Sequence, residues 1–394
     1  MDILYISRLT SERLVDVILR ETGKNPGFAI QKFSRLLTKG LLKNDTNVYS
    51  LSSPPYNRCN TSKRYIKISD EVENGVAYSY IPIVNLPIIK SIVDFIYVFI
   101  YIFKWNKNNK DHKAVIFDVL NISACISGIM ACKMLRIQTV GIVTDMPSLL
   151  SARGSFLGRM VSKLNNSFLS SFDKYVFITE QMNTDINSNN RPYIVMEGLV
   201  DSSMSETENE ASQKKHPREI LYAGGLYEKF GIKTLIDAVK SLHRSDIKLV
   251  LYGSGPMVEE LNNDDFSGLE YRGVAPNNEV MKAEIESTLL VNPRPTHEAF
   301  TRYSFPSKNM EYMTTGTPLL TTRLPGMPAE YHSFVYLFDE ETVEGYARKI
   351  EEIISYSDEM LQQKGKAAKQ FVIENKNEKV QGRRVLDLIS ICNK

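Results

Sequence analysis

Apolar runs alternate with segments of helical periodicity along the whole chain. In the first half the strand-like runs are Ile3–Ile6, Val48–Leu51, Val76–Val84, Ala114–Phe117, Thr139–Val143 and Tyr175–Ile178. Several are continuously apolar rather than alternating, which is typical of parallel strands that are buried on both faces. Patterns such as SACISGIMACKML and FLGRMVSKLNNSFL lie between them and predict helices. The first half therefore predicts a parallel α/β domain.

A polar stretch interrupts this alternation near the middle of the chain. DSSMSETENEASQKKHPRE, residues 201–219, has no apolar period and predicts a linker or an exposed loop. The alternation then resumes with the strand-like segments EILYAG, IKLVLYG, LEYRG, TLLVNPR and PLLTT, each followed by a helical pattern or a loop. We expect parallel sheets with right-handed crossovers in both halves.

The predicted fold class is α/β, with two Rossmann-like domains that face a central cleft. The N-terminal domain takes residues 1–200, a linker takes 201–218 and the C-terminal domain takes 219–370. Residues 371–394 predict a helix that returns to the N-terminal domain. A chain of 394 residues agrees with two domains, because one domain usually holds roughly 100–200 residues.

Composition and charge argue against several classes of function. The chain has 43% hydrophobic and 24% charged residues, as ordinary soluble proteins do. A net charge of +2 argues against a nucleic-acid binder, which carries a strong basic stripe. The four cysteines and five histidines are scattered without ligand spacing, so we expect neither a metal site nor a disulfide. Because a strand-like segment follows Met1 directly, we expect no signal peptide and a cytoplasmic protein.

One very apolar segment tests the cytoplasmic interpretation: LPIIKSIVDFIYVFIYIFKW, residues 86–105. Its uncharged run from Phe95 to Phe103 is far shorter than the ~20 residues that a membrane-spanning helix needs. A helix buried in the N-terminal domain is one interpretation, since helices that are apolar all round are usually buried. The other is an interfacial helix at an anionic membrane surface, which the lysines that follow the segment favour.

Candidate ligand-binding residues lie in the loops after the C-terminal strands, because ligands bind at the carboxyl ends of parallel strands. Gly224 and Gly225 would let the backbone approach a ligand closely, and Lys229 precedes a helix. Gly253 follows the next strand. Ordinary tight turns with a solvated lysine are the alternative for these residues. No G-x-G-x-x-G dinucleotide fingerprint is present at the first of these loops.

The segment NPRPTHEAFTRYSFPSKNMEY carries the most informative candidates. Arg294 follows a buried strand directly, where a guanidinium can reach a phosphate. Pro306 suits the first helical position, so Ser307 and Lys308 fall in the first turn, where backbone N–H groups and the dipole attract an anion. Glu311 lies near Lys308 on the same face. A plain Lys308–Glu311 surface ion pair is the alternative.

Asp145 is the candidate of the N-terminal half. The segment GIVTDMP ends a predicted strand and places this carboxylate at the strand's carboxyl end. We hypothesise that Asp145 orients an acceptor or a sugar, and an Asx cap or turn is the alternative.

At these residues the sequence resembles the group 1 (family 4) retaining glycosyltransferases of the GT-B fold, especially the bacterial surface-polysaccharide enzymes. Four stretches match in order: ILYAGGLYEKFGIKTLIDA, LVLYGSGPMVEEL, YRGVAPNNEV and SFPSKNMEYMTTGTPLL. They span about residues 220–320, and the last stretch is the most specific. In the N-terminal half VTDMP, YVFITEQM and VMEGLVD agree more loosely.

The resemblance implies a nucleotide-sugar donor on the C-terminal domain and an acceptor on the N-terminal domain. The family's E-x7-E motif ends in a glutamate that binds the ribose hydroxyls, and this residue maps onto Glu311. Counting back seven places reaches Ser304, not a glutamate, so the contact to the donor sugar is changed. The family's arginine and lysine for the diphosphate fall on Gly225 and Phe230. Our hypothesis assigns the positive charge to other residues: Lys229, Arg294 and Lys308.

The resemblance also implies a retaining transfer without metal or cofactor. Negative charge grows on the departing diphosphate, and cations with a helix N-terminus stabilise it. No D-x-D motif stands at a loop where a metal-dependent transferase needs one. The implied acceptor is a lipid-linked oligosaccharide of capsule, exopolysaccharide or O-antigen synthesis, handled at the inner leaflet of the membrane. A UDP-sugar is the favoured donor, with GDP as the alternative nucleotide.

Two further interpretations stay open on the sequence. The first is another GT-B enzyme, such as a nucleotide-sugar epimerase, or a phosphorylase that would need a lysine for pyridoxal phosphate. The second is a non-catalytic subunit that pairs with an active transferase, because the family's first glutamate is missing.

Overall fold

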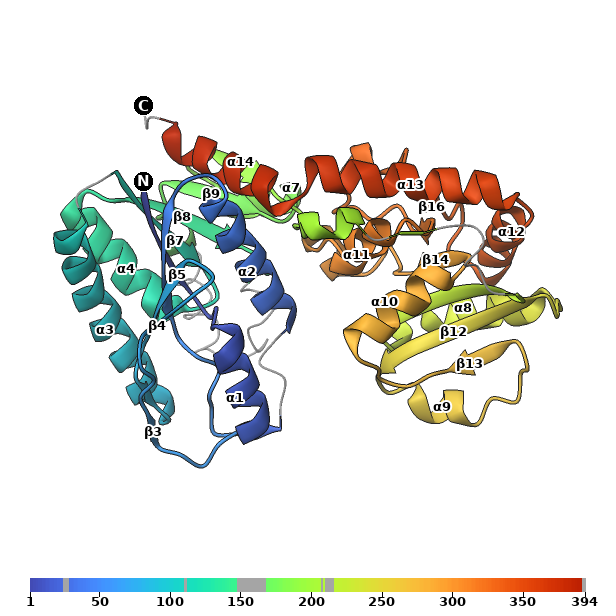
Figure 1. Cartoon of the computed structure of the whole chain (residues 1–394), viewed down its shortest axis with the longest axis horizontal. Coiled ribbons are helices and arrows are strands. Elements are labelled where there is room, and N and C mark those ends of the chain that lie inside the picture. The colour runs from blue at the N-terminus through green and yellow to red at the C-terminus, as the bar shows by residue number, and fades with distance from the viewer. Residues whose placement is uncertain (24–27, 110–111, 147–167, 207, 210–215, 392–394) are drawn as a thin grey trace. The chain divides into compact units, whose positions relative to one another are not determined.

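The computed structural model describes residues 1–23, 28–109, 112–146, 168–206, 208–209 and 216–391. Its contacts divide the chain into two compact units. Unit 1 comprises Met1–Leu199 together with Glu378–Lys394, and unit 2 comprises Val200–Asn377. The chain therefore leaves unit 1 once and returns to it at the C-terminal end (Figure 1). Most of the predicted helix FLGRMVSKLNNSFL and the centre of the polar stretch 201–219 lie outside the described residues.

Unit 1 is built on an eight-stranded sheet in the order β10-β9-β8-β7-β1-β2-β5-β4. Its strands are β1 (Asp2–Ser7), β2 (Asn47–Ser52), β4 (Glu71–Glu73), β5 (Val76–Tyr80), β7 (Lys113–Asp118), β8 (Gln138–Val143), β9 (Lys174–Phe177) and β10 (Tyr193–Val195). All neighbours pair in parallel except β4, which runs antiparallel to β5 at the edge. The continuously apolar runs thus form strands that are covered on both faces.

Two expectations about these strands are wrong. The run Val76–Val84 is not one strand but two, β5 and β6 (Ile83–Val84), and β6 pairs antiparallel with β3 (Tyr65–Ile66) in a separate sheet. The large sheet is also not wholly parallel, because β4 and β5 form a hairpin. Asn74 and Gly75 at its turn have φ of 50° and 82°, the conformation that lets two residues reverse a strand.

Helices cover both faces of the unit 1 sheet. On one face lie α1 (Glu12–Thr22), α2 (Phe28–Leu42) and the C-terminal α14 (Glu378–Ser390). On the other face α3 (Pro87–Asn108) and α4 (Ile122–Leu135) lie side by side (Figure 1). The shorter α7 (Glu180–Ile186) follows β9. This layering is the doubly wound arrangement expected when helices connect parallel strands.

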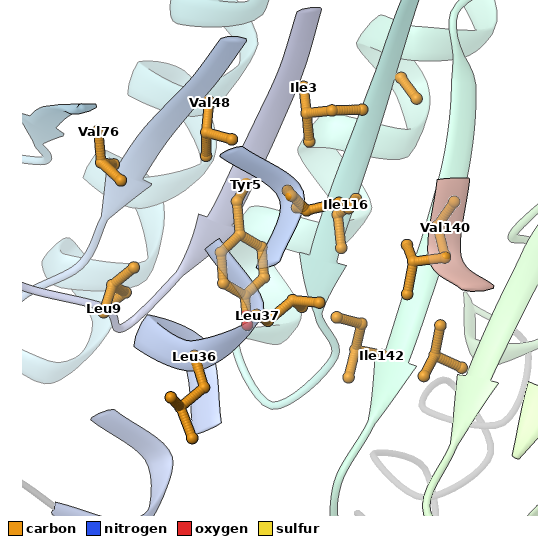
Figure 2. Close-up of a cluster of buried hydrophobic side chains, with 14 of the residues drawn as sticks. Ile3, Tyr5, Leu9, Leu36, Leu37, Val48, Val76, Ile116, Val140 and Ile142 are labelled. Atoms are coloured by element: carbon orange, nitrogen blue, oxygen red, sulfur yellow. The ribbon is translucent and has the colours of Figure 1, made fainter. Parts of the chain in front are cut away.

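The core of unit 1 fills the space under α1, α2 and α14. Figure 2 shows its centre, where sheet residues meet the helical layer: Ile3, Tyr5, Val48, Val76, Ile116, Val140, Leu36 and Leu37. The hydroxyl of Tyr5 is fully buried and shares a hydrogen bond of 3.0 Å with Ser34. Successive residues of a strand point to opposite faces, so Phe117, next to Ile116, packs instead against Gly128 of α4.

The C-terminal helix α14 is held to unit 1 by polar and close backbone contacts. The fully buried Lys174 donates from Nζ to the carbonyl oxygens of Leu388 and Ile389, each at 2.8 Å. A cation at this helix end satisfies the last carbonyl groups and favours the helix dipole. At the other end Gly40 of α2 lies so close that an added Cβ would come within 1.9 Å of the carbonyl oxygen of Glu378.

Unit 2 contains a six-stranded, wholly parallel sheet in the order β13-β12-β11-β14-β15-β16. Its strands are β11 (Arg218–Gly225), β12 (Ile247–Ser254), β13 (Leu269–Tyr271), β14 (Leu289–Asn292), β15 (Leu319–Thr321) and β16 (Tyr336–Leu337). Its helices are α8 (Ile232–Ser241), α9 (Val258–Asn262), α10 (Asn277–Glu286), α11 (Ser307–Thr315), α12 (Val343–Ile354) and α13 (Asp358–Asn375). Both units are therefore Rossmann-like, as the sequence predicts.

The apolar segment of residues 86–105 forms most of α3, and it is not buried all round. Val98, Ile102 and Trp105 face the interior, whereas Ile92 and Ile96 are each 52% exposed. The interpretation of a wholly buried helix is therefore wrong for one side of α3. Among the described residues, no helix is long and apolar enough to cross a membrane.

Candidate active site

The first turn of α11 begins at Ser307, which is exposed. Pro306 precedes the helix as its N-cap with φ −64° and ψ 114°, so the prediction that it occupies the first helical position is wrong by one residue. A proline has no side-chain acceptor, and no side-chain hydrogen bond caps the helix. The N-terminal N–H groups thus lack a side-chain cap, which is the arrangement that attracts an anion.

Lys308, in the same first turn, lies between two carboxylates. Its Nζ is 2.9 Å from Glu311 and 4.0 Å from Glu284. Burial alone would lower the pKa of Lys308, but the charges of Glu311 and then Glu284 outweigh it and raise that pKa. The Lys308–Glu311 pair that the sequence offered as an alternative does form, but both side chains are more than two-thirds shielded from solvent. It is therefore more than an exposed surface pair.

Tyr312 connects this helix to the carboxyl-terminal part of β11. Its fully buried hydroxyl accepts a hydrogen bond from the N–H of Ala223 at 2.7 Å and donates to the carbonyl oxygen of the same residue at 3.2 Å. These bonds fix α11 beside Gly224 and Gly225, which end β11. Sequence reasoning missed Tyr312, because its partner lies 89 residues away along the chain.

Arg294 follows β14 and is packed between aromatic rings. Its guanidinium carbon is 4.7 Å from the ring centre of Phe230 and 5.5 Å from that of Phe300. Burial lowers the pKa of Arg294, yet an arginine side chain keeps its proton far above neutral pH. Its Nε is buried and has no hydrogen-bond partner among the described residues. A buried charged donor without a partner is costly, and an anionic ligand would remove that cost.

The loop after β11 places Lys229 against the same aromatic group. The Nζ of Lys229 lies 5.5 Å from the ring centres of both Tyr227 and Phe230. A Cβ on Gly225 would come within 3.0 Å of the Tyr227 ring and 3.2 Å of the Phe230 ring. Phe230 thus contacts Lys229 on the β11 loop and Arg294 on the β14 loop, so two of the proposed cations share one ring.

Gly253 has a structural explanation that needs no ligand. It adopts φ +131°, and an added Cβ would lie 1.8 Å from the carbonyl oxygen of Gly224 on the neighbouring strand. The close approach of β11 and β12 requires glycine here. Gly224 is also confined, because a Cβ there would lie 2.7 Å from the hydroxyl of Tyr222.

Ser304 stands in extended backbone just before α11. Its Oγ is buried and has no hydrogen-bond partner among the described residues. Seven residues must separate the two glutamates of an E-x7-E motif, so the first position falls strictly on Tyr303 rather than on Ser304. Neither residue is a glutamate, and the departure from the motif stands. Asn309, which the sequence reasoning missed, is also buried here and accepts a hydrogen bond from Asn292 at 2.6 Å.

Asp145 lies in unit 1, after β8, and is not part of the unit 2 cluster. The residue is exposed, but desolvation of its carboxyl group and the nearby Asp118 carboxylate raise the pKa of Asp145. Among the described residues, no group of three or more His, Cys, Asp or Glu side chains is placed to hold a metal ion.

Unit 1 has a cavity of about 1030 Å³ at the carboxyl ends of β1, β2 and β7. The N-terminal turns of α3 and α4 form one wall, largely through isoleucine. Polar groups converge on the same space from Arg8, Lys90 and Asp94. Burial raises the pKa of Asp94 to about 6, although the charges of Lys90 and Arg8 oppose this shift. Sequence reasoning proposed no site at these residues.

Known proteins share the fold of this chain and part of its sequence pattern. Residues 217–356 match the sequence family described as "Glycosyl transferases group 1". The whole chain superimposes on the E. coli trehalose-6-phosphate protein bound with UDP-2-fluoro glucose, with a TM-score of 0.68 at 8% identity and 100% coverage of both chains. The chain therefore has the GT-B fold, and its residues 217–356 carry the sequence of group 1 glycosyl transferases.

Other structures share the fold of this chain across its length. Sucrose-phosphate synthase from Thermosynechococcus elongatus has a TM-score of 0.66 at 13% identity, and the match covers 99% of this chain and 98% of that one. Anabaena HepE in complex with UDP has a TM-score of 0.64 at 11% identity, covering 99% and 100%. At these identities the likeness concerns the fold alone. No curated protein matches this chain significantly in sequence.

Proposed function

We propose that the enzyme transfers a sugar from a nucleotide diphosphate sugar, with the donor bound by unit 2. The observation that carries the proposal is Arg294, a partly buried cation whose Nε has no partner among the described residues. It follows a parallel strand, as phosphate-binding groups in α/β sheets do. The uncapped N-terminus of α11 adds a second anion-attracting element to the same unit.

Each neighbouring residue takes a distinct role in this proposal. Arg294, Lys229 and Lys308 face the diphosphate and stabilise the negative charge that grows on it as the glycosidic bond breaks. Ser307 and the backbone at Gly224 and Gly225 allow the phosphates to come close. The reaction retains the configuration at the anomeric carbon. It needs no metal ion, because these three cations supply the positive charge that a metal ion would provide.

Glu311 and Ser304 recognise the rest of the donor. The carboxylate of Glu311 accepts hydrogen bonds from the ribose hydroxyls, and the ammonium group of Lys308 lies 2.9 Å from it. Ser304, next to Tyr303 at the first position of the family's motif, turns its buried hydroxyl to the sugar. We favour UDP as the nucleotide, in keeping with the UDP and UDP-sugar ligands of the similar structures.

The acceptor side of the proposal rests on unit 1. Its cavity is lined by apolar side chains with a few converging charges, the usual character of a small-molecule site. We propose a lipid-linked oligosaccharide of capsule, exopolysaccharide or O-antigen synthesis as acceptor, with Asp145 orienting the reacting groups.

A thermal-shift panel of nucleotide sugars tests the donor. A ligand at 100 times its Kd adds roughly 2.7 kcal/mol to the unfolding free energy, which raises the melting temperature by several degrees. We expect a shift with one UDP-sugar and with UDP itself, and slow hydrolysis of that sugar by the purified protein. The absence of a shift with every nucleotide diphosphate contradicts the proposal, and a shift without hydrolysis or transfer supports a non-catalytic binding subunit.

A further inference from the structure

The outer side of α3 exposes a row of isoleucine side chains. Ile88, Ile92, Ile96 and Ile100 follow each other at intervals of one helical turn. Ile88 is 78% exposed, and Ile89 and the other three are between 44% and 52% exposed. The row runs about 18 Å along the helix, at 1.5 Å per residue. A continuous aliphatic strip of this length on a folded domain is typical of an interaction site rather than of scattered surface residues.

The neighbouring helix α4 continues the apolar surface. Met130 is 48% exposed and Met134 is 67% exposed. The two helices are packed together, and Ser127 of α4 donates a hydrogen bond to the carbonyl oxygen of Phe95 in α3. We call this surface the α3–α4 face and define it by these residues: Ile88, Ile89, Ile92, Ile96, Ile100, Met130 and Met134.

The charged side chains that α3 and α4 themselves expose are all basic. Lys104, Lys107, Lys133 and Arg136 are exposed towards the C-terminal ends of the two helices. Asp94 is the only acidic residue within α3 and α4, and it is turned inward with 5% exposure. Aliphatic side chains bordered by basic ones match the acyl region and the anionic headgroups of a lipid bilayer.

The side-chain types favour lipid over a protein partner. Protein interfaces are centred on Trp, Tyr and Arg, whereas five of the seven exposed large hydrophobic side chains of α3 and α4 are isoleucine. Aliphatic side chains gain most from entering hydrocarbon and offer no directional contact to a protein surface. Because no described helix can span the bilayer, α3 and α4 would lie along its surface.

We propose that the α3–α4 face docks on the surface of an anionic lipid bilayer, with α3 lying in the interface. Ile88 and Ile92 belong both to this face and to the wall of the unit 1 cavity. Docking therefore brings the cavity, with Arg8 and Lys90, to the level of the headgroups. A lipid-linked acceptor can enter from the bilayer without leaving it, and this last consequence rests on the proposed function.

Vesicle co-sedimentation of the full chain, without donor or acceptor, tests the docking. We compare vesicles of phosphatidylcholine alone with vesicles of phosphatidylcholine and phosphatidylglycerol in equal amounts. We expect stronger binding to the anionic vesicles, and weaker binding as salt rises, because salt screens the lysine–headgroup attraction. No binding to either kind of vesicle would overturn the proposal.

A triple variant locates the docking surface. Ile92→Gln, Ile96→Gln and Ile100→Gln replace exposed positions with a good helix former, so the fold is kept. We expect at least about tenfold weaker vesicle binding, since each change removes aliphatic surface that would enter the lipid. The matched control, Val17→Gln with Leu19→Gln, alters exposed apolar residues of α1 and should bind as the unchanged protein does. Equal binding by the triple variant and the unchanged protein would overturn the proposal.

Two measurements distinguish docking on a bilayer from dimerisation through the α3–α4 face, and test the donor site separately. If the face joins two copies of the chain, sedimentation velocity shows a dimer that the triple variant abolishes, with no vesicle binding, and the proposal is overturned. The shift in melting temperature with UDP should be unchanged in the triple variant, because unit 2 binds the nucleotide. A missing UDP shift with intact vesicle binding refutes the proposed donor site and leaves the docking surface standing.

Discussion

The two units use the same architecture and present different chemistry at the carboxyl ends of their strands. In unit 2 the loops after β11 and β14 bring Lys229 and Arg294 to one aromatic ring, beside a helix without a side-chain cap. In unit 1 the same edge of the sheet has an apolar cavity with Asp94 buried in its wall. The comparison shows that the parallel sheet supplies the position, and the loops decide whether that position suits a diphosphate or an amphipathic acceptor.

Replacing Arg294 of unit 2 should have the largest effect, and this effect is on catalytic activity. We expect Arg294→Ala to lower kcat/KM for the donor by about 100-fold or more, because a preorganised charge at the leaving group is lost. Arg294→Lys should recover only part of this activity, since an ammonium cannot reproduce the guanidinium fork. Steady-state kinetics with a UDP-sugar give the answer, and Arg348→Ala on the exposed side of α12 serves as control. Near-normal turnover in Arg294→Ala would remove this residue from the site.

The next largest effect, on stability, should come from replacing glycines at which a helix lies close to another backbone segment. Such glycines occur in both units. A Cβ on Gly365 of α13 would lie 1.9 Å from the carbonyl oxygen of Gly316, and one on Gly382 of α14 would lie 2.5 Å from the backbone of Gly40. We expect Gly365→Ala and Gly382→Ala each to lower the unfolding free energy by about 1–3 kcal/mol through overpacking. Urea unfolding of the two variants measures this loss of unfolding free energy. Gln363→Ala, an exposed position of α13, should change stability by only a few tenths of a kcal/mol.

The pH dependence of the unfolding free energy should report on Asp94, the buried carboxyl group in the wall of the unit 1 cavity. Burial raises the pKa of Asp94 from 3.8 to about 6, so the folded protein holds this proton more tightly than the unfolded chain. The stabilisation is complete below pH 3.8 and is lost as the pH rises through about 6. Asp94→Asn has no such loss, so its stability relative to the unchanged protein should rise by about 3 kcal/mol across that window.

Urea unfolding at a series of pH values checks this prediction. The control is Asp16→Asn, which makes the same substitution on the exposed side of α1. A stability difference for Asp94→Asn that stays constant with pH would show that the carboxylate is hydrated, and the apolar character assigned to the cavity would then be wrong.

The smallest expected effect concerns Ser304. Its buried hydroxyl has no hydrogen-bond partner among the described residues, so Ser304→Ala should leave stability unchanged or raise it by less than about 1 kcal/mol. The KM for the donor should rise severalfold if this hydroxyl contacts the sugar. Parallel unfolding and kinetic measurements separate the two effects. An unchanged KM would exclude Ser304 from donor recognition.

Much of the fold could be predicted from local patterns. Continuously apolar runs identified the parallel strands of both units, because strands covered on two faces need no polar alternation. The β4–β5 hairpin was missed although Asn74-Gly75 is a strong turn signal, since β4 has only three residues and none of them is buried. The exposed side of α3 was not predictable in the same way, because a helix that is apolar all round carries no periodicity that says which side is covered.

The candidate site was predictable only in part. Arg294 and Lys308 follow from strand-to-loop and helix-start patterns along the chain. Local patterns could not identify Tyr312 and Phe230, because their roles depend on partners that the fold brings together from distant segments. The unit 1 cavity has the same origin, since its walls come from β1, β2, α3 and α4.

The central claim, a diphosphate site in unit 2 centred on Arg294, can be tested by calorimetric titration of UDP into the purified protein. Three proteins are compared: the unchanged chain, Arg294→Ala and the control Arg348→Ala. The account predicts saturable binding of one UDP to the unchanged chain and to the control, and at least about tenfold weaker binding to Arg294→Ala. Equal affinity of UDP for all three proteins would contradict it.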